Sequence, residues 1–225
     1  AVLWRQKRPV MRAVFLDLDG TLTDSGEGIL KSVDYALSKL DLPALSGDTD
    51  WIIGPPLWDS FTRLGVPEGD LEQAVALYRE RYTKVGYLEN KLYDDILQQL
   101  SDLHEAGYLM YLATAKPMSY AAKITAHFSI SNYLTDQFGS EEDGTRSDKT
   151  SLLAHALSVA KSTPEQAIMI GDRHYDVIGA KANGMLALGA AYGYGGMAEL
   201  RGAGADELIE TPHRLAATVR EYLPM

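Results

Sequence analysis

The chain has 225 residues, of which 46% are hydrophobic and 23% are charged, and it contains no cysteine. This composition is typical of a soluble globular protein with one substantial core, and it excludes disulfide scaffolds, thiolate zinc sites and a cysteine nucleophile. The net charge of −10 argues against a basic nucleic-acid surface, and no apolar run reaches the roughly 18 residues of a membrane span. We therefore expect a cytoplasmic protein without nucleic-acid or membrane partners.

The first ten residues, 1–10, are too short and too charged to be a signal peptide. Met11 lies directly before the first strand-like run and is a candidate natural start. We therefore leave residues 1–10 outside the predicted fold and treat them as an N-terminal extension.

The first predicted element is a β-type apolar run at residues 14–16, which ends in Asp17 and Asp19. Two acids at the end of a hydrophobic strand repel each other and resist desolvation, so they require a compensating charge. A hard, oxygen-liganded cation such as Mg²⁺ suits carboxylates best. Gly20 and Thr21 follow directly, and we expect them to turn the chain sharply and aim amide groups at an anion such as phosphate.

Residues 26–90 have apolar positions at helical spacing and no clear strand. One stripe runs from Ile29 to Leu40 and another from Leu71 to Tyr82, and between them Gly54, Pro55 and Pro56 break the chain. We interpret this segment as an inserted helical cap, with hinges near residues 23–26 and 90–93. Its many tyrosines are expected to serve mainly in the cap core and at the interface with the rest of the molecule.

Beyond residue 93, predicted helices and strands alternate. The strands are expected near residues 108–113, 133–138, 167–170, 185–188 and 207–209. The helices are expected near residues 96–103, 119–127, 152–157, 175–183 and 212–222, with Gly107 and Gly184 as stops and Ser147 or Asp148 as a cap. This alternation predicts a doubly wound parallel α/β sheet.

Two later strands also end in polar residues. Thr114 follows the run at 108–113, and Asp172 follows the run at 167–170 with Asp176 four residues further on. Because sites in open α/β folds lie outside the carboxyl ends of the strands, we expect these side chains to meet Asp17 at one edge of the sheet.

In this order the motifs resemble those of the haloacid dehalogenase superfamily of phosphohydrolases. They are Asp-x-Asp-Gly-Thr at 17–21, Thr114, Lys149, and Gly-Asp at 171–172 with Asp176. The resemblance covers most of the chain and is nearest to the phosphoglycolate phosphatase-like branch. It implies an α/β core of the Rossmann type, made of residues 11–25 and 91–225, with a second, smaller all-helical cap domain at 26–90.

The resemblance further implies a Mg²⁺-dependent phosphatase that hydrolyses a small phosphomonoester through an aspartyl-phosphate intermediate. The implied catalytic residues are Asp17 as nucleophile, Asp19 as general acid and base, Thr114 and Lys149. The implied phosphate contacts are Gly20, Thr114, Ala115 and Lys149. Asp17, Asp172 and the backbone carbonyl of Asp19 would hold Mg²⁺, while Asp176 would orient the lysine or a metal-bound water. Gly54, Pro55 and Lys116 would lie near the substrate.

Several alternatives stay open at this point. Lys116 and Arg146 compete with Lys149 for the role of the phosphate-neutralising cation, and Arg173 and His174 are expected at the rim of the site. The substrate is either phosphoglycolate-like or a nucleoside monophosphate, because the loop at 53–57 and Thr-x-Lys-Pro also resemble members described as 5′-nucleotidases or tyrosine phosphatases. A sugar-phosphate mutase or a non-catalytic phosphate-binding protein would keep the same motifs. The oligomeric state is undetermined.

Overall fold

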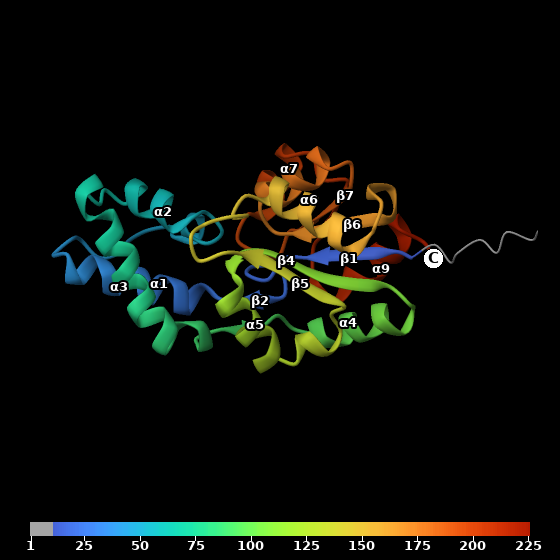
Figure 1. Cartoon of the computed structure of the whole chain (residues 1–225), viewed down its shortest axis with the longest axis horizontal. Coiled ribbons are helices and arrows are strands. Elements are labelled where there is room, and N and C mark those ends of the chain that lie inside the picture. The colour runs from blue at the N-terminus through green and yellow to red at the C-terminus, as the bar shows by residue number, and fades with distance from the viewer. Residues whose placement is uncertain (1–10) are drawn as a thin grey trace, which may run out of the picture.

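A computed structural model describes residues 11–225 (Figure 1). The expectation that residues 1–10 form an extension falls outside the described residues. A six-stranded parallel sheet forms the centre, in the order β5, β4, β1, β6, β7, β8. The strands are β1 (Ala13–Leu16), β4 (Leu109–Pro117), β5 (Asp136–Ser140), β6 (Ala167–Gly171), β7 (Leu186–Ala190) and β8 (Glu207–Ile209).

Strand β1 lies in the middle of the sheet and is buried along its whole length. It pairs in parallel with β4 on one side and β6 on the other, so that Phe15 aligns with Tyr111 and Met169. Successive side chains of a strand point to opposite faces, and accordingly Val14 and Leu16 enter one apolar core while Ala13 and Phe15 enter the other. A strand covered on both faces has to be apolar throughout, which explains the unbroken hydrophobic run in the sequence.

Helices cover both faces of the sheet (Figure 1). On one face lie α4 (Ile96–Glu105), α5 (Met118–His127) and α9 (Leu215–Tyr222), and on the other lie α6 (Lys149–Ala160), α7 (His174–Ala182) and α8 (Gly196–Gly202). The predicted doubly wound α/β sheet is therefore confirmed. Of the two residues predicted to cap α6, Asp148 is the N-cap, because its carboxylate accepts a hydrogen bond from the Ser151 amide at 2.9 Å.

A smaller helical unit lies beside the sheet, at the left of Figure 1, and is coloured blue to teal-green. It contains α1 (Gly26–Lys39), α2 (Leu57–Arg63) and α3 (Leu71–Lys84). These helices bury an apolar cluster of their own, to which Val33, Leu37, Phe61, Val75 and Tyr82 belong. The predicted helical cap is thus confirmed as a structural feature, whereas domain boundaries at residues 26 and 90 stay a prediction.

The two chain crossings between sheet and cap pair with each other, because β2 (Thr23–Asp24) and β3 (Lys91–Leu92) form a small antiparallel ribbon. The hinges predicted at these crossings stay a prediction. The ribbon itself was not predicted, because strands of two residues are too short to leave a pattern in the sequence. Strand β4 also differs from expectation. It continues past residue 113 to Pro117, with an irregular register between Ala113 and Pro117, so Thr114 lies within the strand instead of after it.

Other elements shift by a few residues. The strand expected at 133–138 is β5 at Asp136–Ser140, and α8 has no counterpart among the predicted helices. The closing helix begins with a 3₁₀ turn, Pro212–Arg214, before α9. Across residues 11–225, every helix is too short or too polar to traverse a lipid bilayer.

Candidate active site

The polar residues predicted at the strand ends do meet at one edge of the sheet. Asp17 directly follows β1 and Asp172 directly follows β6, and the Asp17 amide donates to the Ile170 carbonyl at 2.9 Å. Asp17, Thr114, Asp172 and Asp176 are all buried. Four polar side chains buried in one place require compensating partners, because unpaired charges are costly to desolvate.

Lys149 supplies the first of these partners. It is the first residue of α6 and is buried, and its Nζ lies 2.9 Å from Asp17 Oδ2 and 2.7 Å from Asp176 Oδ1. The same ammonium donates to the Ala113 carbonyl at 2.8 Å. Burial alone would lower the pKa of Lys149, but the carboxylates of Asp17 and Asp176 outweigh this and raise it, so the lysine stays charged.

The three candidate cations therefore have different partners. Lys149 contacts Asp17, whereas Lys116 Nζ lies 2.9 Å from Asp19 Oδ2. Arg146 pairs with Glu141 on the loop before α6. The arrangement places Lys149, and neither rival, at the predicted nucleophile.

Three carboxylates form a cluster that fits a divalent cation. One oxygen from each of Asp17, Asp172 and Asp176 lies within 4.8 Å of the others. Oδ2 of Asp172 accepts the Tyr194 amide at 2.8 Å, but its Oδ1 is buried without a hydrogen-bond partner. Burial and the carboxylates of Asp176 and Asp17 raise the pKa of Asp172 well above its ordinary value. A hard cation would satisfy the free oxygen and relieve this repulsion.

Asp176 joins Asp17 and Asp172 in this side-chain cluster, while the side chain of Asp19 turns to Lys116. The ligand expected from Asp19 is its backbone carbonyl, so the direction of its side chain leaves that expectation a prediction. Both oxygens of Asp176 already have protein partners, because Oδ1 forms an ion pair with Lys149 at 2.7 Å and Oδ2 accepts the Arg173 amide at 3.1 Å. Asp17 is engaged in the same way, by Lys149 at 2.9 Å and by the Leu18 amide at 2.8 Å. Of these three carboxylates, Asp172 is the one with an oxygen that has neither a hydrogen-bond nor an ion-pair partner, so it is the best placed to receive a cation.

Gly20 is required by the geometry of the turn after β1. Its φ is +77°, and a Cβ at this position would lie 2.1 Å from Oδ2 of Asp172, so a side chain would collide with the carboxylate cluster. The expected anion-binding amides are not free, however. The Gly20 amide donates to the Thr23 carbonyl at 2.8 Å and the Thr21 amide to the Leu18 carbonyl at 3.3 Å. The prediction that these amides point at phosphate is therefore wrong, because the tight turn consumes them internally.

Thr114 and Ala115, near the end of β4, line a cavity between sheet and cap. Thr114 Oγ1 accepts the Lys116 amide at 3.3 Å. The irregular end of β4 brings Lys116 into the site as well. Its Nζ contacts the hydroxyl of Tyr82 in α3 at 2.7 Å in addition to Asp19, so the cap contributes directly to this cluster.

Arg173 fastens the cap loop to the sheet. It was expected at the rim, but only 7% of it is exposed. Its guanidinium donates to the carbonyl of Ile53 in the cap, and its Nε lies 2.9 Å from Glu199 Oε1. Glu199 also accepts the His174 amide at 2.8 Å. Burial alone would raise the pKa of Glu199, but these hydrogen bonds lower it to about 2, so the pair stays charged.

Tyr194 makes a second connection of this kind. Its hydroxyl donates to Asp24 Oδ1 at 2.7 Å and accepts the Gly26 amide at 2.8 Å. Sequence reasoning found no role for Tyr194, Tyr82 and Glu199, and it predicted Arg173 only at the rim. For Tyr194 the sequence does contain one signal, because this residue stands between two glycines beyond a predicted strand. The structure explains the glycines, since a Cβ on either one would collide with Asp172.

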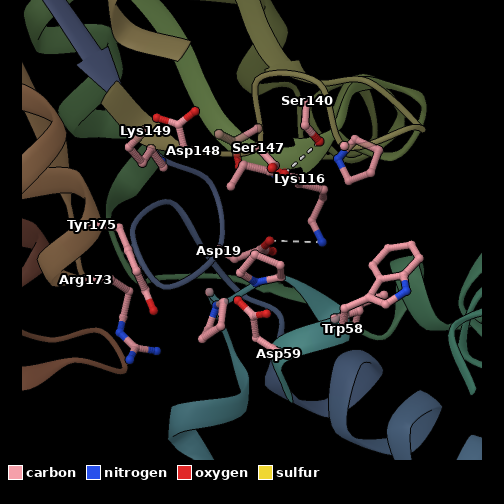
Figure 2. Close-up of a pocket in the computed structure, with 18 of the residues that line it drawn as sticks. Asp19, Trp58, Asp59, Lys116, Ser140, Ser147, Asp148, Lys149, Arg173 and Tyr175 are labelled. Carbon is pink, nitrogen blue, oxygen red and sulfur yellow. Dashed lines mark hydrogen bonds and ion pairs between the residues drawn. The ribbon is translucent and has the colours of Figure 1, made fainter. Parts of the chain in front are cut away.

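A cavity of about 690 Å³ opens over these residues between sheet and cap (Figure 2). From the cap it is lined by the loop with Gly54 and Pro55, both predicted near the substrate. The predicted catalytic residues Asp17, Asp19, Thr114 and Lys149 also line it, as does Lys116, which is predicted near the substrate. The cavity has the size of pockets that bind small molecules, about 300–1,000 Å³.

Known proteins share this sequence and architecture. A 5′-nucleotidase from Pseudomonas aeruginosa is 41% identical over 191 residues, covering 84% of this chain and 86% of that protein. The tyrosine-protein kinase PtkA of Mycobacterium tuberculosis is 38% identical over 209 residues, covering 92% and 70%. The crystal structure of a predicted phosphatase from Clostridium acetobutylicum matches with a TM-score of 0.89 and 38% identity, covering 94% and 99%. The family model described as haloacid dehalogenase-like hydrolase matches residues 14–190, and the chain therefore belongs to that family.

Proposed function

We propose that this protein is a Mg²⁺-dependent phosphatase that hydrolyses a small phosphomonoester, phosphoglycolate-like or a nucleoside monophosphate, through a phosphorylated Asp17. The observation that carries the proposal is the surroundings of Asp17. It is a buried carboxylate that lines a ligand-sized cavity, 2.9 Å from Lys149 and clustered with Asp172. Family membership supports the same class of reaction.

The side chains of Asp17 and Asp172 and the backbone carbonyl of Asp19 would hold the Mg²⁺ ion. Their fit to such an ion rests on the unpartnered buried Oδ1 of Asp172 and on the mutual repulsion of the carboxylates. When bound, Mg²⁺ supplies charge stabilisation for the phosphoryl oxygens.

In the first half of the reaction, a carboxylate oxygen of Asp17 attacks phosphorus and the bond to the leaving alkoxide breaks, while Asp19 donates the proton that this alkoxide needs. In the second half, Asp19 takes a proton from a water molecule, which attacks the aspartyl-phosphate and releases inorganic phosphate. Lys149, beside Asp17, would offset the charge on the phosphoryl group throughout, and the hydroxyl of Thr114, which lines the cavity, would donate to one of its oxygens.

The covalent step can be tested by chemical trapping. With p-nitrophenyl phosphate and Mg²⁺, we expect release of both p-nitrophenol and inorganic phosphate. Quenching with sodium borohydride, which reduces an acyl phosphate to an alcohol, should convert Asp17 to homoserine, as detected by peptide mass spectrometry. Trapping at a different residue, or turnover without any trapped residue, would contradict the assignment. Absence of inorganic phosphate among the products would favour the mutase alternative instead.

Replacing Lys149 with methionine should lower kcat for p-nitrophenyl phosphate by about 10²-fold or more, the scale of losing one electrostatic contact to the transition state. The variant removes the ammonium that lies between Asp17 and Asp176. Arg146→Met is the matched control, since Arg146 pairs with Glu141 on the loop and should retain wild-type kcat. The reverse pattern would transfer the role to Arg146. Circular dichroism checks that Lys149→Met still folds.

A further inference from the structure

We infer that the preferred leaving group carries a flat, uncharged ring and no second anionic group, and that Trp58 and Tyr175 are the residues that select it. This inference rests on the proposed phosphatase function and goes beyond it, because it discriminates between the two substrate classes that the catalytic residues leave open.

Aromatic side chains form two walls of the cavity. Trp58 belongs to α2 of the cap and Tyr175 to α7 of the sheet domain, and they lie on opposite sides of Asp19 (Figure 2). Both are exposed, to 43% and 39%, and Ile178, one turn after Tyr175, also lines the cavity with 51% exposed. Large apolar side chains left exposed inside a cavity indicate contact with a ligand. Flat rings stack favourably on aromatic faces.

The size of the cavity agrees with such a ligand. Its volume of about 690 Å³ lies within the range of pockets that enclose drug-sized molecules. The phosphate-binding end occupies only the part next to Asp17 and Lys149. The whole cavity far exceeds what a two-carbon acid and its phosphate would fill, and a nucleoside-sized group suits it better.

The cations of the cavity are almost all engaged by the protein. Lys149 pairs with Asp17 and Asp176, Lys116 with Asp19, and Arg173 with Glu199. Arg79 is the one cavity-lining cation without a carboxylate partner within the described residues, and it donates to the Glu142 carbonyl at 3.2 Å. Its guanidinium also lies 5.7 Å from the centre of the Trp58 ring. Among the cavity-lining side chains of residues 11–225, no pair of free cations is available to bind a second anionic group.

Exposed carboxylates also line the same cavity. Asp59, Glu142, Asp143 and Asp148 line it, and none has a cationic partner among the ion pairs of residues 11–225. These four carboxylates outnumber the single cation Arg79, so they produce a negative electrostatic potential in this part of the cavity. A leaving group with its own carboxylate would be repelled there, whereas an uncharged ring would not.

Matched substrate pairs test both halves of the inference on the wild-type protein with Mg²⁺. Adenosine 5′-monophosphate and methyl ribofuranoside 5-phosphate differ only in the base, and we expect kcat/KM to be at least about tenfold higher for the nucleotide. The second pair, 2-hydroxyethyl phosphate and 2-phosphoglycolate, differs only in the carboxylate. The uncharged ester should be preferred, and this preference should shrink as NaCl is raised, because salt screens exposed charges.

Trp58→Ala should lower kcat/KM for adenosine 5′-monophosphate about tenfold while leaving methyl ribofuranoside 5-phosphate nearly unchanged, and Trp58→Phe should restore most of the loss. Trp51→Ala is the matched control, because Trp51 packs against Arg63 in the cap and does not line the cavity. If the wild type hydrolyses p-nitrophenyl phosphate, the inference is overturned by either of two results. One is an equal kcat/KM for adenosine 5′-monophosphate and methyl ribofuranoside 5-phosphate, and the other is a preference for 2-phosphoglycolate over 2-hydroxyethyl phosphate. Loss of p-nitrophenyl phosphate hydrolysis in the wild type would instead overturn the proposed function, and the inference with it.

Discussion

Replacing Asp17 with asparagine should reduce kcat for p-nitrophenyl phosphate by about 10⁴-fold or more, the scale seen when a catalytic nucleophile is removed. The amide has the same shape as the carboxylate but cannot attack phosphorus effectively. Steady-state hydrolysis and borohydride trapping measure the effect, and both signals should disappear together. Substantial turnover in this variant would contradict the assignment of Asp17 as nucleophile.

The same variant should remain folded. Burial raises the pKa of Asp17, the ammonium of Lys149 opposes this, and the Asp176 carboxylate adds to it. A neutral amide avoids the repulsion with Asp176, and Lys149 keeps Asp176 as a partner at 2.7 Å. We therefore expect a cooperative thermal transition at or near the wild-type Tm. Asp136→Asn, at an exposed position at the start of β5, is the matched control and should keep full activity.

Removing divalent metal should have an effect of similar size. Treatment with EDTA is expected to lower kcat for p-nitrophenyl phosphate by about 10³-fold or more, and excess Mg²⁺ should restore it, because the ion offsets charge on both the carboxylate cluster and the phosphoryl group. The measurement is a Mg²⁺ titration of the chelated protein. Full activity in EDTA would exclude the metal-dependent reaction.

Asp172→Asn locates that metal independently of turnover. Mg²⁺ binding to the folded state should raise the Tm of the wild-type protein, since a ligand that binds only the native state stabilises it by mass action. The variant keeps the shape of a side chain that contacts the Tyr194 amide at 2.8 Å but loses its charge. Its Tm should respond to Mg²⁺ only at concentrations at least about tenfold higher. An unchanged response would place the ion elsewhere.

Much of the site could be read from local patterns. Asp17 and Asp172 stand at the ends of apolar runs. Because the carboxyl ends of parallel strands meet at one edge of the sheet, recognising these runs as strands was enough to predict that the two side chains lie close together. Lys149 depended on the order of the motifs along the chain, because a lysine near a helix start carries no local signal. The structure then placed it 2.9 Å from Asp17 and assigned its two rivals to other carboxylates.

The errors have equally local causes. The turn at Gly20 and Thr21 was recognised, but the pattern of residue types does not say where amides point, and here they bond within the turn. Thr114 was placed after a strand that continues to Pro117, since an irregular register leaves no mark on hydrophobic periodicity. The ribbon of β2 and β3 was missed because two residues per strand are below any recognisable period.

The sequence by itself determined the parallel α/β sheet, the helical cap and the carboxylates at the strand ends, because hydrophobic periodicity and chain order are local properties. Only the tertiary structure decided how the cap meets the sheet. Arg173 holds a carbonyl 120 residues away, and Tyr82 reaches Lys116 from 34 residues away. Such contacts depend on how rigid elements pack, and no local pattern encodes a pairing between two surfaces. The side chains that close the cavity and face its ligand therefore became visible only in the folded chain.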